Sequence, residues 1–260
     1  MQASLSDFWR DKRSSDQTEE LALVLKFAKG FISLFGEGYD ASWGKQSRVS
    51  SSGKSAKDKT VTLDFSPLKD KQVPFDGSDI DLIMGEAIHE SGHIRYSYDK
   101  SELVKAAQGQ FKYRVAKEVH YCANIIEDFY IENKVSKDNP TLGLYLKDAK
   151  RHFAQTANIP QWMIDDMRQD SPSMTSIITA WGLISLLDWN PPQNISETSR
   201  KLLTQLVGNT ITAAKANAHK KRIKLSLDSY QLVSALGTVP EPKPPKPERI
   251  GQEGEDSDGE

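Results

Sequence analysis

The chain has 260 residues, enough for one domain or two small ones at roughly 100–200 residues per domain. A hydrophobic share of 37%, a charged share of 27% and a mean hydropathy of −0.57 exclude an integral membrane protein. A formal charge of −2 gives the molecule no overall field that would attract nucleic acid or an acidic bilayer.

Cysteine usage and the first residues bear on the cellular compartment. The single cysteine, Cys122, cannot form an internal disulfide bond. Residues 1–15 lack the apolar core of a secretory signal. We therefore expect a cytoplasmic protein.

The first quarter of the chain predicts a helix, a loop and a strand. An apolar stretch over residues 21–35 ends at Gly36, a residue typical of a helix C-terminus. Residues 36–59 are rich in Gly, Ser and Lys and predict a surface loop. In residues 60–65 the apolar side chains alternate, and Pro67 follows, which predicts a short strand with one buried face.

Helices dominate the rest of the pattern. Ser78 lies where a helix N-cap belongs, and apolar residues follow it at mostly helical spacing. A long amphipathic pattern over residues 111–135 predicts a second helix, which Pro140 stops. Residues 141–237 are also mostly helical in pattern. Turns are expected there at three places: 158–160, 171–172 and 190–192.

The last residues have a different composition. Five prolines alternate with charges after residue 239, and an acidic run ends the chain, so residues 239–260 predict a disordered tail or linker. The expected organisation is one folded domain over residues 1–238, of α+β class but mainly α, followed by this tail.

The motif H-E-x-x-H occupies residues 89–93, inside the helix that begins near residue 78. At about 100° per residue, His89 and His93 lie about 40° apart on one helix face, so both imidazoles can reach one metal ion. Glu90 points to the side, where a carboxylate suits the role of general base. This spacing predicts a metal site with catalytic geometry.

Two histidines and a glutamate can also share a helix face by chance, as packed or solvated side chains. The flanking residues, among them Ile83 and Ile88, are apolar, so unpaired imidazoles would be costly there. Gly92 costs about 1 kcal/mol relative to alanine in a helix, which is easier to understand if another element approaches closely. Both features favour the metal site.

A third protein ligand is expected from the second helix. Glu127 has mostly apolar neighbours one turn away, so its carboxylate needs a strong partner, which metal would provide. Asp128, about 100° away, is suited to accept the outer N–H of a ligand histidine, and Asn124 beside it is also expected among the outer partners of the site. The roles of Glu127 and Asp128 can be exchanged, and an ion pair with a basic residue elsewhere is the ordinary alternative for either.

Two further residues of this helix are candidates for catalysis. His120 lies seven residues before Glu127 on nearly the same face, where it could hold substrate or stabilise an oxyanion. Tyr130 could donate to the same oxyanion. For both, a packing or surface role is the plain alternative.

Two other segments suggest binding. The strand over residues 60–65 could pair with an extended peptide near the metal, or be one strand of a small sheet. A basic run over residues 215–224 could contact nucleic acid, but it lacks interleaved aromatic residues and is more typical of a solvated helix end. Nucleic acid is therefore not the expected partner.

The motifs H-E-S-G-H-I-R and N-I-I-E-D-F-Y-I-E, within residues 89–132, resemble metallopeptidase-like segments of bacterial and phage proteins. In those proteins the segment precedes a von Willebrand factor A (VWA) domain, and the group is related to the cobaltochelatase T-subunit type. This gluzincin-like resemblance implies Zn²⁺ held by His89, His93 and Glu127, with Glu90 as base. It also implies a zincin-like fold with two antiparallel active-site helices and a small sheet.

The same resemblance implies a setting. The proline-rich, acidic tail is similar to the linker that leads to the VWA domain in such proteins, so a VWA-domain protein or an AAA+ ATPase is a candidate partner. The implied location is the cytoplasm of a bacterium or of a phage-infected cell.

These patterns predict a zinc-dependent metallopeptidase that hydrolyses peptide bonds of a protein or peptide substrate, with Glu90 as general base. The alternative is a non-catalytic interaction or assembly protein with a structural or vestigial zinc site. Replacement of Glu90 by glutamine separates the two, because it should stop turnover in an enzyme and be silent in an assembly protein.

Overall fold

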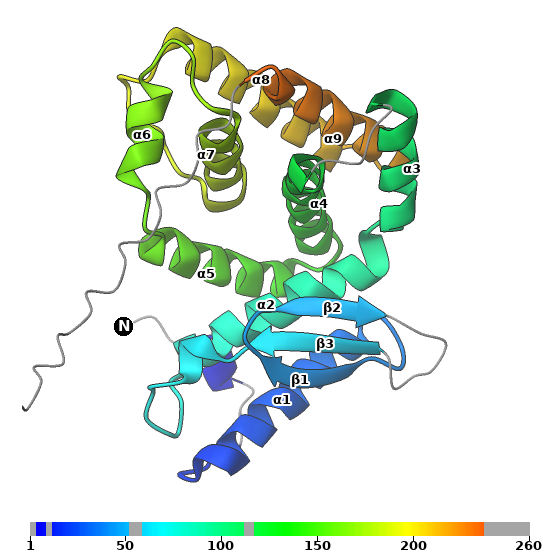
Figure 1. The fold of residues 1–260 in the computed structure, drawn as a ribbon. Coiled ribbons are helices and arrows are strands. Elements are labelled where there is room, and N and C mark those ends of the chain that lie inside the picture. The colour runs from blue at the N-terminus through cyan, green and yellow to red at the C-terminus, as the bar shows by residue number, and fades with distance from the viewer. Residues whose placement is uncertain (1–3, 9–11, 52–58, 112–116, 237–260) are drawn as a thin grey trace, which may run out of the picture.

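A small sheet lies against helix α2 (Gly77–Tyr96) in the computed structural model (Figure 1). The structure describes residues 4–8, 12–51, 59–111 and 117–236. The strands are β1 (Asp40–Gly44), β2 (Arg48–Ser51) and β3 (Lys59–Asp64), in the order β1-β3-β2. The central strand β3 pairs in parallel with β1 and antiparallel with β2.

Nine α-helices are found in the described part of the chain, which makes the protein mainly helical with a small mixed sheet. Besides α2 they are α1 (Gln17–Ser33), α3 (Lys100–Phe111), α4 (Lys117–Asp138), α5 (Pro140–Thr156), α6 (Gln161–Met167), α7 (Met174–Leu187), α8 (Glu197–Ala214) and α9 (His219–Ser234). None of the helices described is long and apolar enough to span a lipid bilayer.

Local sequence explains where several helices begin. The side chains of Asp16, Ser173 and Ser196 accept hydrogen bonds from backbone N–H groups in the first turns of α1, α7 and α8. Asn139 does the same for α5, whose first residue is Pro140, the usual place for proline in a helix.

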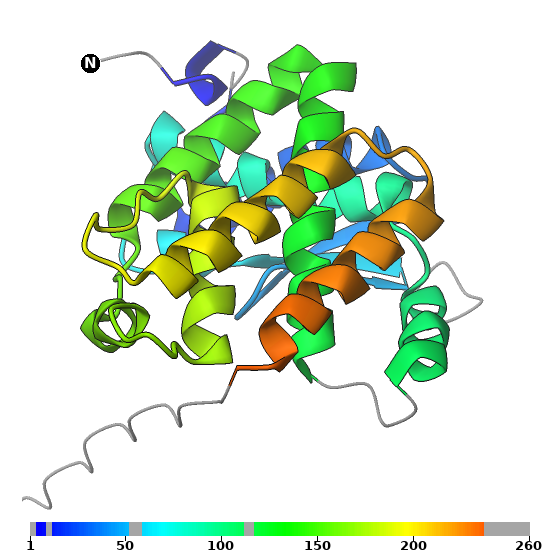
Figure 2. The same cartoon turned by 90° about the horizontal axis from the view of Figure 1, so that it is seen from above.

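Helix α4 is the centre of the molecule. Its residues belong to all three hydrophobic clusters: one with α1, the sheet, α2 and α5, one with α6 to α9, and one with α3 and α9. Figure 1 shows α4 almost end-on with helices on all sides, and Figure 2 shows α8 and α9 lying side by side across it. A side chain on α4 can therefore meet elements from distant parts of the sequence.

Two glycines let α2 pack closely on its neighbours. A Cβ atom at Gly92 would overlap Cγ2 of Ile131 on α4, which confirms the expectation that another element approaches there. A Cβ atom at Gly85 would lie 2.6 Å from Cβ of Ala149 and 2.7 Å from the carbonyl oxygen of Tyr145, both on α5. Glycine at these positions sets the spacing between α2 and the helices that face it.

Most predicted elements are confirmed, with some errors. The strand over residues 60–65, the helix near residues 21–35, a helix near residue 78 and the three turns after residue 141 are all present. The predicted N-cap at Ser78 is wrong, because α2 begins at Gly77 and its N-cap is Asp76. Of the helix predicted over residues 111–135, residue 111 ends α3, residues 112–116 lie outside the described residues, and α4 begins at Lys117. The predicted surface loop over residues 36–59 is wrong in part, because it contains β1 and β2. Residues 239–260, predicted to be a tail, lie outside the described residues.

Candidate metal centre

Helix α2 presents His89 and His93 one turn apart toward α4. Their ring centroids are 5.1 Å apart and the rings are nearly perpendicular. Each side chain is about one-quarter exposed, at 24% and 23%. The two imidazoles therefore lie in a shallow recess between the helices, where solvent still reaches them.

Asp128 on α4 completes the group. Its Oδ1 atom lies 3.3 Å from Nε2 of His93 and 3.9 Å from Nε2 of His89. One ligand atom from each of the three residues lies within 4.8 Å of the other two. Tetrahedral zinc ligands at 2.0–2.1 Å from the ion are about 3.4 Å apart, so small side-chain movements are enough for these three atoms to share one ion.

The outer nitrogen of each histidine is held by a neighbour. Nδ1 of His93 lies 2.9 Å from Oγ of Ser97, and Nδ1 of His89 lies 3.3 Å from Oε1 of Glu132. These contacts leave both Nε2 atoms directed at Asp128. Such outer partners fix the tautomer and ring orientation of metal-binding histidines, so this group is suited to hold a metal ion.

The local electrostatic field favours a cation. Burial alone lowers the pKa of His89, but the hydrogen bond to Glu132 and the charges of Asp128, Glu132 and Glu90 outweigh it and raise this pKa to about 9. Carboxylates that stabilise a proton on His89 in this way also stabilise a divalent ion in its place.

The expected third ligand, Glu127, does not face the histidines. Its carboxylate oxygens accept hydrogen bonds from Nε of Arg222 at 2.5 Å and from Nη2 at 3.4 Å. Arg222 is completely buried and also donates to the carbonyl oxygen of Tyr96 at 3.0 Å. The structure therefore groups Asp128, and not the expected Glu127, with the two histidines, and it pairs Glu127 with Arg222.

This difference has a physical cause. Glu127 and Asp128 are successive residues of α4, so their side chains point about 100° apart and only one can face α2. Glu127 points inward and forms an ion pair with Arg222 on α9. The basic run over residues 215–224 therefore supplies a buried structural cation at Arg222, while Lys224 pairs with Asp228 on the same helix.

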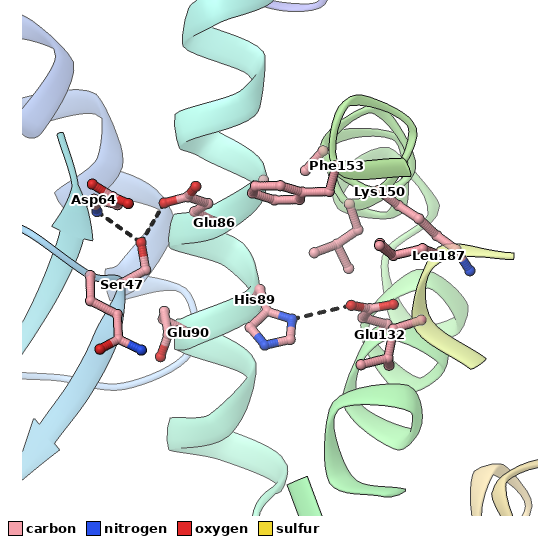
Figure 3. Close-up of a pocket in the computed structure, with 14 residues that line it drawn as sticks. Ser47, Asp64, Glu86, His89, Glu90, Glu132, Lys150, Phe153 and Leu187 are labelled. Atoms are coloured by element: carbon pink, nitrogen blue, oxygen red, sulfur yellow. Dashed lines mark hydrogen bonds and ion pairs between the residues drawn. The ribbon is translucent and has the colours of Figure 1, made fainter. Parts of the chain in front are cut away.

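A cavity of about 330 Å³ opens beside His89. Figure 3 shows His89 directed at Glu132 and Glu90 leaving α2 on the side of Ser47, both bordering this cavity. Glu90 is half-buried. Its predicted role as base therefore has a space next to it in which a substrate can bind.

Glu86 also lines this cavity, and sequence reasoning missed it. It is 9% exposed, and its Oε2 accepts a hydrogen bond from the hydroxyl of Ser47, which in turn accepts one from the N–H of Asp64 at 2.8 Å. Burial, only partly offset by the Ser47 hydrogen bond, raises the pKa of Glu86 to about 7. The sequence feature that could have identified Glu86 is its position about one helical turn before Glu90.

The other predicted residues have different surroundings. Tyr130 is buried, and the guanidinium carbon of Arg222 lies 3.7 Å from its ring centroid, so this residue packs under the ion pair. His120 makes no hydrogen bond or ion pair with the three donors in the described part of the structure. The structure therefore brings neither residue into the metal group.

Asn124, predicted to be an outer partner of the site, is exposed and borders a second cavity of about 350 Å³. Asp128 and Tyr121 border the same cavity, and α7 forms its opposite wall. The metal group thus has one cavity next to His89 and another next to Asp128.

Comparison with known proteins gives no match: no family model, no curated protein and no solved structure is similar to this chain. The geometry of the site is therefore the ground on which a function is proposed.

Proposed function

We propose that the protein is a zinc-dependent peptidase in which His89, His93 and Asp128 hold the ion. The single observation that carries this proposal is the convergence of these three donors next to a cavity that Glu90 also borders. A donor set of two histidines and one carboxylate leaves a fourth position open, which is typical of catalytic and not of structural zinc sites.

When bound, Zn²⁺ in such a site lowers the pKa of water and polarises a carbonyl group. The chain's own residues supply the proton transfers. Glu90 follows His89 directly in the sequence, and both side chains border the same cavity. Glu90 accepts a proton from the attacking water and passes it to the leaving amine.

The two metal-bearing helices support the resemblance to zincin-type peptidases. His89 meets Glu132, and His93, one turn later on α2, meets Asp128, one turn earlier on α4. The helices thus contact each other in reverse order, as two antiparallel active-site helices would. We extend the proposal to a zincin-like arrangement in which Asp128 takes the third position.

The two cavities suit an extended substrate. The first is bordered by Glu132 of α4 and Leu186 and Leu187 of α7, and the second by earlier residues of the same two helices. They therefore follow one another along α4 and α7, with Asp128 between them on α4. A polypeptide laid along this line places one peptide bond next to the three donors.

The test is peptide cleavage by wild type and by Glu90→Gln, each loaded with Zn²⁺. General base catalysis contributes about 10²–10⁴-fold in rate, so we expect Glu90→Gln to lose at least about 100-fold in cleavage rate while it retains zinc. Glu102→Gln, an exposed carboxylate on α3, is the matched control. Equal cleavage by Glu90→Gln and wild type would contradict the proposal, and zinc binding without any cleavage would support the assembly-protein alternative.

A further inference from the structure

The cavity beside His89 has two walls of different chemistry. Helices α5 and α7 supply an apolar wall, formed by Leu146, Ala149, Phe153, Leu186 and Leu187. The opposite wall carries the carboxylates of Glu86 and Glu90 on α2 and of Asp64 at the end of β3. Figure 3 shows Phe153 lying across from Glu86.

Positive charge within the cavity is already neutralised. Lys150 borders it, but its Nζ lies 3.0 Å from Oδ2 of Asp188, outside the lining. Glu86 makes no ion pair with a lysine or arginine of the described residues, and its hydrogen-bond partner is the neutral hydroxyl of Ser47. The acidic wall therefore has, at Glu86, a carboxyl group without a cationic partner among the described residues.

The apolar wall is partly open to water. Phe153 is 39% exposed, and it borders a cavity that is large enough to hold a side chain. An aliphatic chain laid on this ring would remove apolar surface from water. Arginine and lysine combine such an aliphatic stem with a charged end.

We propose that this cavity selects a long basic side chain of the substrate, lysine or arginine, with the stem on Phe153 and Leu187 and the cationic end at Glu86. This inference rests on the proposed peptidase function, because it names the substrate class for the same site. Glu86 and Phe153 are then specificity-determining residues, which bind the side chain and take no part in the proton transfers.

The protonation behaviour of Glu86 is in line with this role. Its pKa of about 7 leaves the side chain partly protonated at neutral pH. A bound cation favours the carboxylate form, so binding of a basic side chain is accompanied by proton release.

The decisive probes are Nα-acetyl-lysine amide and Nα-acetyl-norleucine amide, which share the stem and differ in the charged end. We expect the full chain, with or without Zn²⁺, to bind the lysine amide about tenfold more tightly in an NMR titration. Glu86→Gln should reduce this ratio to about twofold or less, while Glu102→Gln should leave it unchanged. Phe153→Ala, an exposed change, should weaken both ligands by a similar factor.

Equal affinity of the wild-type chain for the two amides would overturn the inference, regardless of how the variants bind them. Cleavage profiling with a peptide library separates this failure from failure of the proposed function. Cleavage without enrichment of lysine or arginine next to the cut bond contradicts the specificity alone. Absence of all cleavage, with the lysine preference retained in binding, contradicts the peptidase and leaves the basic-side-chain site.

Discussion

Two neighbouring carboxylates on α4 differ in function because of where each points. Asp128 faces the histidines of α2, whereas Glu127 forms a buried ion pair with Arg222 of α9. Sequence analysis considers these two residues for the third ligand, because Glu127 has mostly apolar neighbours and Asp128 is next to it on the same helix. It does not decide between them, because the choice depends on an arginine that is 95 positions away.

The ion pair makes a prediction about stability. Arg222 is 0% and Glu127 6% exposed, so Arg222→Met leaves a buried, unpaired carboxylate. We expect this variant to lose about 3–5 kcal/mol of unfolding free energy, as is usual when one partner of a buried pair is removed. The double variant Arg222→Met, Glu127→Leu should regain most of that loss in urea unfolding. A double variant as unstable as the sum of both single variants would contradict the role of the pair.

Glu86 makes a prediction about pH. The pKa of Glu86 is about 7 in the folded chain, whereas an ordinary glutamate has a pKa of 4.5. Between these two pH values the folded chain therefore keeps a proton that the unfolded chain releases. This contribution to stability is fully present below about pH 4.5 and is lost as the pH rises through about 7. Glu86→Gln removes the effect, so between pH 5 and pH 8.5 its unfolding free energy should gain roughly 2.5 kcal/mol relative to that of wild type.

Urea unfolding of both metal-free proteins at the two pH values checks this prediction. Glu102→Gln, whose carboxylate is exposed, should show no such gain. A difference between Glu86→Gln and wild type that does not change with pH would mean that Glu86 is not perturbed by burial.

At the scale of elements, packing against α2 decides the geometry of the site. Gly92 permits α4 to approach, and the same helix pair carries all three metal donors. A larger residue at this position has to separate the helices or displace Ile131. The spacing of His89, His93 and Asp128 therefore depends on a glycine that is not part of this group.

Gly92→Ala tests this dependence. Its Cβ overlaps Ile131 Cγ2, so the gain in helix propensity should be outweighed by overpacking, with a net loss of about 1–3 kcal/mol in unfolding free energy. A second change, Ile131→Ala, removes the overlapping atom, and Gly92→Ala should cost much less in that background. If Gly92→Ala stabilises the wild-type chain in thermal or urea unfolding, the close approach of α2 and α4 is not real.

The elements also show where sequence reasoning fails. The helix α2 was predictable because its apolar spacing and its H-E-x-x-H motif agree, although its N-cap is Asp76 and not the expected Ser78. Strands β1 and β2 were missed because they are five and four residues long and rich in Ser and Gly, without the alternation that identified β3. They form as edge strands on β3, which is a tertiary contact that no local pattern contains.

In the molecule as a whole, the site lies where separate hydrophobic clusters meet. Helix α4 belongs to each of them and brings Asp128 to α2 while Glu127 is held by α9. Local periodicity predicted a mainly helical fold class, and the motif spacing predicted that His89 and His93 share one face of α2. The cavity and the place of Glu86 depend on how α5, α7 and the sheet enclose α2, which periodicity does not determine.

The central claim is that His89, His93 and Asp128 together bind one zinc ion, and equilibrium competition with a zinc-binding dye tests it directly. We expect one high-affinity ion per wild-type chain and a loss of more than about 100-fold in Asp128→Asn, since loss of an outer partner alone costs 10–100-fold. Asp138→Asn, at the exposed end of the same helix, should bind as wild type does. Equal zinc affinity in Asp128→Asn and Asp138→Asn, or no stoichiometric zinc in wild type, would contradict the claim.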